Sequence, residues 1–76
     1  MTRRPKASTA IGRWVRERRT ARALSQADAA REVEVHVGTW TAWEGGRQTP
    51  GWTHLRRLAA WAGVEIGSLV TICDTQ

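Results

Sequence analysis

Two short helical patterns separated by only three residues constrain this chain more than any other feature. Ser25 is a good helix N-cap, and the pattern after it predicts a helix over residues 26–33. A second helix is predicted over residues 37–44, with residues 34–36 as the break between them. Helices joined this tightly must cross steeply, so the second one projects as a half-exposed rod.

The chain is short enough to hold a single domain with a thin core. It has 76 residues, of which five are tryptophan, and no phenylalanine or tyrosine. A domain of this size buries roughly 60% of the surface of its extended chain. Each indole can bury on the order of 150–250 Å², so a few tryptophans can supply much of the core. We expect a flexible basic arm over residues 1–8, a domain over residues 9–70 and a C-terminal tail over residues 71–76.

Positive charge is concentrated at the N-terminal end. The formal net charge is +5, and residues 1–22 hold eight of the twelve Lys and Arg but one of the seven acids. Because the excess runs into the first predicted helix, it favours a surface that binds a polyanion. The alternative is a solvated basic tail that serves solubility. A half-exposed helix on a basic protein is the simplest object that fits the major groove of DNA.

Three further helices are predicted from the spacing of apolar residues. Ser8 or Thr9 can cap the first of them. The stripes are Ile11, Trp14, Val15 and Arg18 in the first helix, Trp52, Leu55, Leu58, Ala59 and Ala62 in the fourth, and Ile66, Leu69 and Val70 in the fifth. Gly63 ends the fourth helix. The predicted fold is therefore all-α, with five short helices.

The helix over residues 37–44 has one bulky side and one small side. The bulky side, which we expect inside, consists of His36, Trp40, Trp43 and Glu44. The small side, which we expect to face outward, consists of Val37, Gly38, Thr41 and Ala42. Gly45-Gly46 ends this helix.

Several classes of protein are excluded by what the chain lacks. Cys73 is the single cysteine, so no internal disulfide can form, which fits a reducing cytoplasm. No apolar run is long enough for a secretory signal or a membrane span. His36 and His54 lie in no short metal-ligand spacing, and no nucleophile–base arrangement or phosphate-binding glycine loop is found. We therefore expect no metal, no cofactor and no enzymatic activity.

An ordered set of residues runs without gaps through most of the chain. It consists of Ile11-Gly12, Arg16-Glu17-Arg18-Arg19, Leu24-Ser25-Gln26, Ala30, Val35, Trp43-Glu44, Gly46, Pro50, Leu55, Leu58-Ala59, Gly63-Val64 and Leu69. This set resembles the lambda-repressor and Cro type of helix-turn-helix domain, also called the XRE family. The resemblance implies a compact five-helix fold with a basic N-terminal arm, and a function in binding double-stranded DNA.

The resemblance also implies contacts with the DNA backbone. The second helix would lie across the backbone, with Ser25 and Gln26 at its start near a phosphate. In the loop after the third helix, N–H groups and a cation would approach phosphate at Gly46 and Arg47. The basic arm would follow the backbone or enter a groove through Arg3, Arg4 and Lys6.

Arg19 and Glu44 match a family ion pair that ties the first helix to the end of the third. Two charges that meet under packed indoles must pair, because removing one buried partner costs about 3–5 kcal/mol. The alternative is two unrelated surface charges. Glu34 stands at the turn where the family usually has glycine. A left-handed backbone there costs a non-glycine residue roughly 1–2 kcal/mol, unless the turn is a slightly different one.

The third helix departs from the family at the positions that read bases. These positions are Val37, Gly38, Thr41 and Ala42. None carries the long amide or guanidinium that makes bidentate contacts to adenine or guanine. Apolar contacts with thymine methyl groups remain, with hydroxyl contacts from Thr39 and Thr41 and a contact from His36. Either the helix sits deep and specificity comes from DNA shape and the basic arm, or the domain binds a protein instead.

The tryptophans fall into two groups by their positions in the patterns. Trp40, Trp43 and Trp52 are expected in the core. Trp14 and Trp61 are each either core residues or part of a surface for a partner. His54 is expected to be exposed on the fourth helix.

These features predict a sequence-specific transcriptional regulator in the cytoplasm, associated with the nucleoid, and specifically a small bacterial or phage repressor of the Cro kind. One helix reads few base pairs, so we expect a homodimer on a near-palindromic operator. The expected dimer surface comprises Ile66, Leu69, Val70 and Ile72. The alternative is a protein-binding module on the same fold, such as an antitoxin or a host-factor inhibitor, with weak DNA affinity.

Overall fold

All five predicted helices are present, and the computed structural model contains no strand in the part of the chain that it describes, residues 9–74. The helices are α1 (Ala10–Ala21), α2 (Gln26–Val33), α3 (Val37–Glu44), α4 (Trp52–Ala62) and α5 (Ile66–Asp74). The all-α prediction is therefore confirmed. The predicted arm, with Arg3, Arg4 and Lys6, lies outside the described residues.

Local caps begin and end the helices where the sequence predicts them. The Thr9 hydroxyl accepts a hydrogen bond from the Gly12 N–H at 2.9 Å and begins α1. The Ser25 hydroxyl accepts the Asp28 N–H at 3.0 Å and begins α2. Gly63 ends α4 with φ 74°, a left-handed conformation that a residue without Cβ adopts freely.

The break between α2 and α3 is tight because Glu34 is left-handed, with φ 66° and ψ 45°. Its N–H donates to the carbonyl of Arg31, and the N–H of Val35 donates to that of Ala30. From α4, Arg57 Nη1 donates to the Glu34 carbonyl at 3.0 Å. Of the two alternatives for this turn, the structure therefore has the left-handed one, which costs a non-glycine residue about 1–2 kcal/mol.

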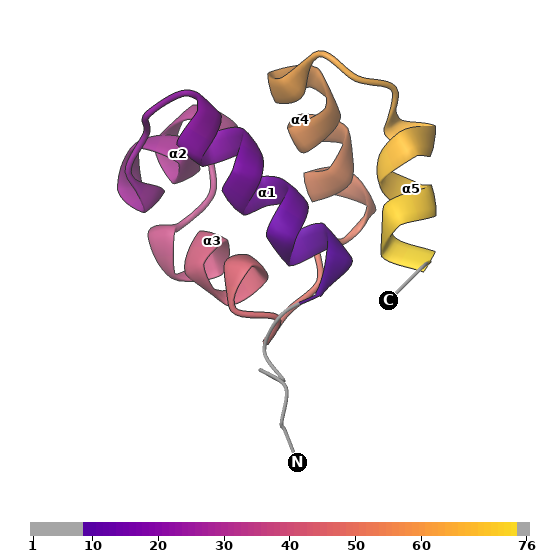
Figure 1. Ribbon diagram of the computed structural model, residues 1–76, viewed down its shortest axis with the longest axis horizontal. Coiled ribbons are helices and arrows are strands. Elements are labelled where there is room, and N and C mark those ends of the chain that lie inside the picture. The colour runs from indigo at the N-terminus through magenta and orange to yellow at the C-terminus, as the bar shows by residue number, and fades with distance from the viewer. Residues whose placement is uncertain (1–8, 75–76) are drawn as a thin grey trace.

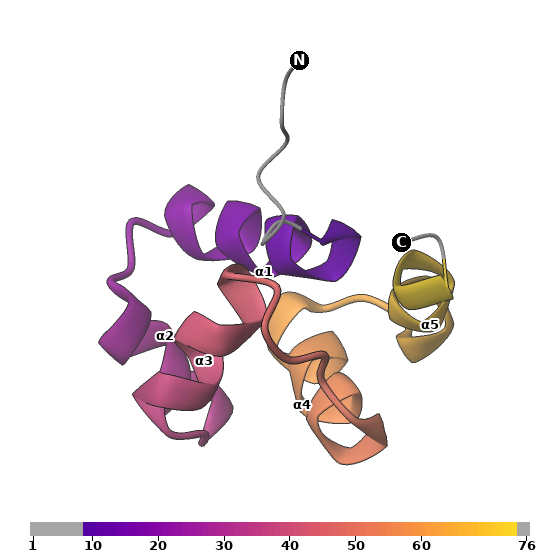
Figure 2. The ribbon, with the colours of Figure 1, turned by 90° about the horizontal axis from the view of Figure 1, so that it is seen from below.

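α1 runs through the middle of the fold, between α2 and α3 on one side and α4 and α5 on the other (Figure 1). Figures 1 and 2 both show α5 at the edge farthest from the α2–α3 pair. All five helices contribute to one core, which consists of Ile11, Val15, Ala29, Ala30, Val33, Trp40, Trp43, Leu55, Leu58, Ala59 and Leu69. One side of α3 is thus held by the core, which leaves its other side free.

Two apolar residues lie elsewhere than predicted. Trp52, expected in the core, is 60% exposed. Helical side chains lean toward the N-terminus, so an indole at the first position of α4 projects past the end of the helix. Leu69, expected at a dimer surface, is fully buried because this side of α5 packs into the core. The helix also continues to Asp74, so residues 71–74 are helical and not the predicted tail.

Trp61 is a half-buried residue with a polar environment at its outer edge. Its ring packs edge-on against Trp40, with 5.5 Å between the centroids. Its Nε1 donates to Glu32 Oε1 at 2.8 Å, and the Arg22 guanidinium lies 4.5 Å from the ring centroid. His54, expected to be exposed, is also half-buried, because it packs against the Trp43 ring at 5.2 Å.

Candidate nucleic-acid interface

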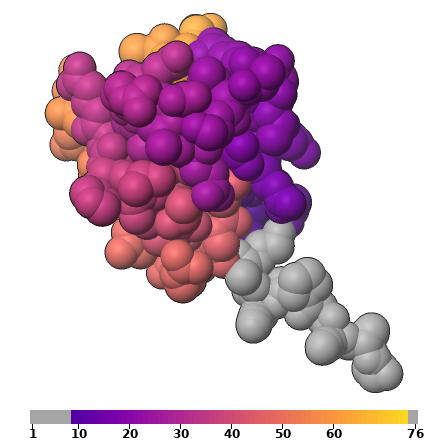
Figure 3. Space-filling view, turned by 90° about the vertical axis from the view of Figure 1, so that its left-hand side faces the viewer, coloured from indigo at the N-terminus to yellow at the C-terminus, as the bar shows by residue number. Residues whose placement is uncertain are grey.

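The outward side of α3 is formed by Val37, Gly38 and Thr41. On the opposite side, Trp40 and Trp43 are 0% and 1% exposed, whereas Val37 is 40% exposed. Gly38 is exposed and Thr41 is half-buried. In Figure 3, α2 and α3 together cover much of one side of the molecule. No side chain larger than valine stands on this side of α3, so another surface can approach its backbone closely.

Two residues of this region lie opposite to the prediction. Ala42, expected to face outward, is 5% exposed. Its carbonyl accepts the N–H groups of Arg47 at 2.9 Å and Gln48 at 3.3 Å, so the returning chain covers it. His36, expected inside, is exposed because it caps α3, with Nδ1 accepting the Gly38 N–H at 2.9 Å. A side chain that turns back over the start of its own helix cannot also enter the core.

A single carboxylate, Glu44, joins α1, α2 and α3. Arg19 donates to it twice, from Nε to Oε2 at 2.6 Å and from Nη2 to Oε1 at 3.1 Å. Gln26 Nε2 donates to Oε1 at 3.1 Å, and Trp40 Nε1 donates to Oε2 at 2.5 Å. Arg19 Nη1 also donates to the Leu24 carbonyl at 2.9 Å, which fixes the turn after α1. The structure thus brings together the ion pair that the resemblance implies and adds two donors.

These two additional donors were missed from the sequence. Trp40 precedes Glu44 by one helical turn, so its Nε1–H was within reach of the carboxylate by spacing alone. No comparable local signal connects Gln26, which lies eighteen positions away on α2. Only the crossing of α2 and α3 brings that amide to Glu44.

Glu44 and Arg19 are both held in their charged forms. Burial is the largest influence on Glu44 and would raise its pKa, but hydrogen bonds from Arg19, Trp40 and Gln26 together with the Arg19 charge outweigh it. The pKa of the Glu44 carboxyl therefore lies below its usual value. The hydrogen bond to Glu44 raises the pKa of the Arg19 guanidinium, although burial opposes it. The side chains are 16% and 7% exposed for Arg19 and Glu44, so solvent screens this pair little.

Ser25 and Gln26 lie at the N-terminus of α2, where unpaired N–H groups and the helix dipole favour an anion. Ser25 is exposed, and its hydroxyl oxygen is the cap acceptor for Asp28. Gln26 is half-buried. Its amide carries two N–H donors, so one remains after the bond to Glu44. This end of α2 keeps polar hydrogens near the C-terminal end of α3, where Glu44 lies.

Gly46 and Arg47 use their backbone N–H groups inside the fold. The Gly46 N–H donates to the Trp43 carbonyl at 3.2 Å, and the Arg47 N–H donates to the Ala42 carbonyl at 2.9 Å. Both N–H groups are thus engaged within the fold, which leaves the expected approach to phosphate to the Arg47 side chain. Gly46 has φ 77° and makes the left-handed turn after α3. The Arg47 side chain is exposed and remains the cation of this loop.

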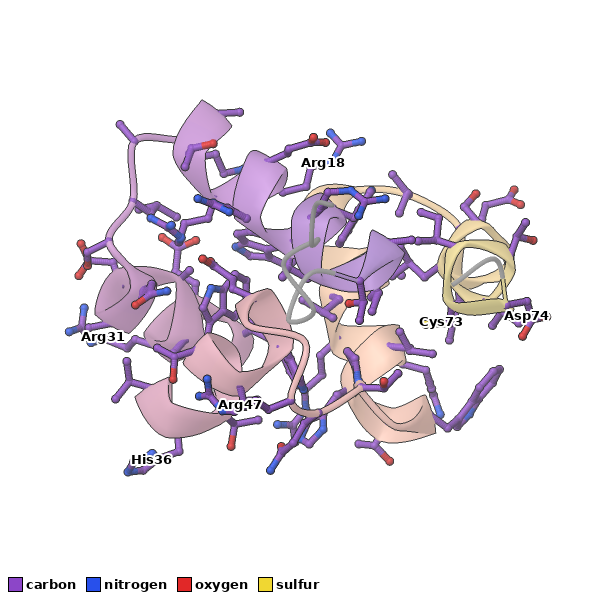
Figure 4. The ribbon with its side chains drawn as sticks, turned by 60° about the horizontal axis from the view of Figure 1, so that its bottom comes forward. Arg18, Arg31, His36, Arg47, Cys73 and Asp74 are labelled. Carbon is purple, nitrogen blue, oxygen red and sulfur yellow. The ribbon has the colours of Figure 1, made fainter. Side chains whose placement is uncertain are left out.

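Arg18, one of the cations of α1, does not lie beside the outward side of α3. Figure 4 shows Arg18 on the opposite side of the molecule from His36 and Arg47. The Arg18 guanidinium lies 5.3 Å from the centroid of the Trp14 ring, which is half-buried. Arg22, at the end of α1, covers the Trp61 indole of α4 in the same way. Arg18 and Arg22 are therefore weaker support for a polyanion surface than the sequence suggested.

Comparison with protein families decides what kind of fold this is. A family model described as a helix-turn-helix domain matches residues 10–70. The chain belongs to the helix-turn-helix family, of the XRE/Cro-like type. This is a family of DNA-binding regulators. No curated protein and no solved structure matches the chain. In this helix-turn-helix domain, α2 and α3 are the two helices of the motif and the left-handed Glu34 is its turn.

Half-buried apolar residues of this helix-turn-helix domain remain on α5. They are Ile66, Val70 and Ile72, which pack against the edge of the core. Within residues 9–74, no helix is long and apolar enough to cross a membrane. In the same range, no three or more His, Cys, Asp or Glu side chains gather as a metal site would require.

Proposed function

We propose that this protein is a sequence-specific transcriptional repressor that acts by occupying a DNA operator, with α3 as its recognition helix. The observation that carries the proposal is the outward side of α3, where Val37, Gly38 and Thr41 leave only small groups. The major groove of B-DNA is about 12 Å wide and admits one α-helix. A helix with small side chains can enter it more deeply than one with long side chains.

The backbone contacts come from both ends of the motif. Ser25 and Gln26 at the start of α2 donate to one phosphate, and the Arg47 cation contacts another beyond the end of α3. Such contacts fix the register of the protein on the duplex without reading sequence. The basic arm adds contacts through Arg3, Arg4 and Lys6.

Few side chains of α3 contact the DNA bases, and those that do are short. The exposed Val37 side chain packs against thymine methyl groups, and the Thr41 hydroxyl oxygen, whose hydrogen is donated to the Gly38 carbonyl, accepts a hydrogen bond from a base. Part of the specificity then comes from the shape and deformability of the duplex at positions that the protein does not touch. The protein therefore tolerates several bases at some positions of each half-site.

A homodimer is proposed because one recognition helix covers few base pairs. Two half-sites would lie about one helical turn apart, roughly 34 Å, in a near-palindromic operator. The dimer surface is formed by α5 through Ile66, Val70 and Ile72, which are half-buried in the monomer. Val70→Asp should then yield a folded monomer by light scattering.

Selection from a random pool of duplexes at fixed salt tests the proposal. We expect one near-palindromic motif. Gln26→Ala and Arg47→Ala should weaken binding to all sequences alike, and Arg47→Ala should also reduce the salt dependence of binding by about one ion. Arg18→Ala is the matched control, since it removes the same charge from the side opposite His36 and Arg47. An Arg18→Ala loss as large as that of Arg47→Ala would refute this arrangement.

A protein-binding module, such as an antitoxin or a host-factor inhibitor, is the second candidate. The exposure of Trp52, at 60%, favours it, because large exposed indoles are typical of protein interfaces. This candidate predicts weak, salt-sensitive DNA binding from which no motif is selected.

A further inference from the structure

The imidazole of His36 is held in one tautomer by the helix that it caps. Its Nδ1 accepts the Gly38 N–H at 2.9 Å. A ring nitrogen that accepts a hydrogen bond carries no proton, so the neutral ring has its hydrogen on Nε2. The residue is exposed, and Figure 4 shows its ring at the outer end of α3, directed away from the rest of the domain. The cap therefore presents an N–H donor of fixed position to the surroundings.

The outward side of α3 offers no equivalent side-chain donor. Val37 and Gly38 have none, and the Thr41 hydroxyl donates to the Gly38 carbonyl at 3.0 Å, so its hydrogen is engaged. Thr39 follows Val37 by two residues, which places it roughly 200° round the helix and away from the outward side. A base edge that meets this part of α3 therefore encounters one oriented donor, the Nε2–H of His36.

We propose that His36, through Nε2–H, is the residue that determines base preference, and that its partner is the N7 atom of a guanine in each half-site. This rests on the proposed function, since it requires α3 to lie in the major groove. Guanine is favoured because its N7 and O6 are adjacent acceptors, whereas adenine places an amino donor beside N7, cytosine offers a donor and thymine adds a methyl group to its single acceptor. The N-cap bond removes the freedom of the ring in advance, so little is lost in ordering it on DNA.

The geometry assigns two separable tasks to one side chain, and substitutions can divide them. Serine at this position retains a cap, because its hydroxyl accepts an N–H of the first turn, but it is too short to reach a base. Alanine retains neither. His36→Ser is therefore the informative variant and His36→Ala is the comparison that removes the cap. Should His36→Ser unfold, His36→Thr supplies a second capping side chain of similar length.

The experiment measures affinity for the selected operator and for copies in which one guanine of each half-site at a time is replaced by 7-deazaguanine, which lacks the N7 acceptor. When 7-deazaguanine replaces one particular guanine, we expect the affinity of the unmodified protein to fall about three- to tenfold, the effect of one neutral hydrogen bond. His36→Ser should bind the unmodified operator more weakly by a similar factor and lose less than twofold on the modified one. Circular dichroism establishes that the variant is folded.

The proposal is overturned if no guanine shows the effect, or if His36→Ser remains as sensitive to 7-deazaguanine as the unmodified protein. A loss of affinity in His36→Ser that is equal for all sequences also overturns it, because that result means a phosphate contact. If no operator is selected at all, the proposed function fails and this inference with it. If an operator is selected and only the N7 dependence is missing, the proposed function stands alone.

Discussion

The backbone of Gly12 in α1 lies against the carbonyl group of Trp43 in α3 so closely that a Cβ on Gly12 would overlap the carbonyl oxygen. The same Cβ would lie 2.9 Å from Thr9 Oγ1, the cap of α1. Because the nearest obstacle is backbone, it cannot move aside as a flexible side chain would. This close approach lets α1 and α3 pack with Arg19 within reach of Glu44.

Gly12→Ala should therefore force α1 and α3 apart. We expect the free energy of unfolding in urea to fall by about 1–3 kcal/mol, the usual cost of overpacking. Gly67→Ala is the matched control, since Gly67 is also helical but a Cβ there meets nothing within 4 Å. That variant should gain about 0.5–1 kcal/mol from the better helix former. Equal stability of the two variants would contradict the close approach.

Ala23 and Glu34 are the described non-glycine residues with positive φ, at 57° and 66°. Glycine relieves roughly 1–2 kcal/mol of strain at such a position. It also increases the conformational entropy of the unfolded chain, which offsets part of this gain in stability. Ala23→Gly and Glu34→Gly should each raise the midpoint of thermal unfolding, by a net gain of about 0.5–1 kcal/mol. Ala60→Gly, on the exposed side of α4, should instead lower stability by about 1 kcal/mol. A loss in the first two variants would mean that these turns are not left-handed.

Acidification should weaken the domain through Glu44. In the folded protein the pKa of its carboxyl lies below the usual value of 4.5. Its contribution is therefore fully present above about pH 4.5 and is lost as the pH falls through the lowered pKa, because the unfolded chain takes up the proton first. Denaturant titrations between pH 7 and pH 3 should show that the free energy of unfolding falls with pH. This fall should be smaller in Glu44→Gln than in the unmodified protein. The pKa of Asp28 is also lowered, by hydrogen bonds from Arg31 and Ser25, so some pH dependence remains in that variant.

The same substitution measures the value of the three-helix junction at neutral pH. Glu44→Gln leaves the Arg19 guanidinium without its charged partner, and we expect a loss of about 3 kcal/mol at pH 7. Arg31→Ala breaks an exposed ion pair with Asp28, in which the side chains of Arg31 and Asp28 are 74% and 47% exposed. That change should alter the free energy of unfolding little, because exposed ion pairs contribute little to stability. Comparable losses in both variants would argue against a special role for Glu44.

The tryptophans should differ widely in their contribution to stability. Trp40→Ala empties a fully buried site and should cost about 3–5 kcal/mol. Trp52→Ala should cost about 0.5 kcal/mol, since most of that indole is already in water. Denaturant midpoints of the two variants test this directly. A large loss for Trp52→Ala would show that its buried fraction carries more packing than its exposure indicates.

Most of the fold could be predicted because the signals that fix it are local. Thr9, Ser25 and Gly63 mark helix ends through their own side chain or the lack of one. The pairing of Arg19 with Glu44 followed from the resemblance, because the ordered motif fixes both positions. The helix ends depend on single residues and their neighbours, whereas the ion pair between distant positions was predicted through the motif alone.

The errors come from contacts between segments that are far apart in sequence or from helix ends. Ala42 has the spacing of an outward residue, but the loop after α3 returns over it. Leu69 has the spacing of either a core or a dimer residue, and only the packing of α5 on the core decides between them. The role of His36 as a cap was missed because histidine is an unusual N-cap compared with serine or aspartate.

The junction at Glu44 has a consequence for the partner as well as for the protein. One carboxylate holds α3 to both α1 and α2, so α3 cannot tilt or slide without breaking the three hydrogen bonds that Arg19 and Gln26 donate to it. If α3 is the recognition helix, as proposed, a duplex that fits imperfectly must bend or change its groove width, because α3 does not move to meet it. Among candidate sites of equal base content, those richest in easily deformed pyrimidine–purine steps should then be bound most tightly.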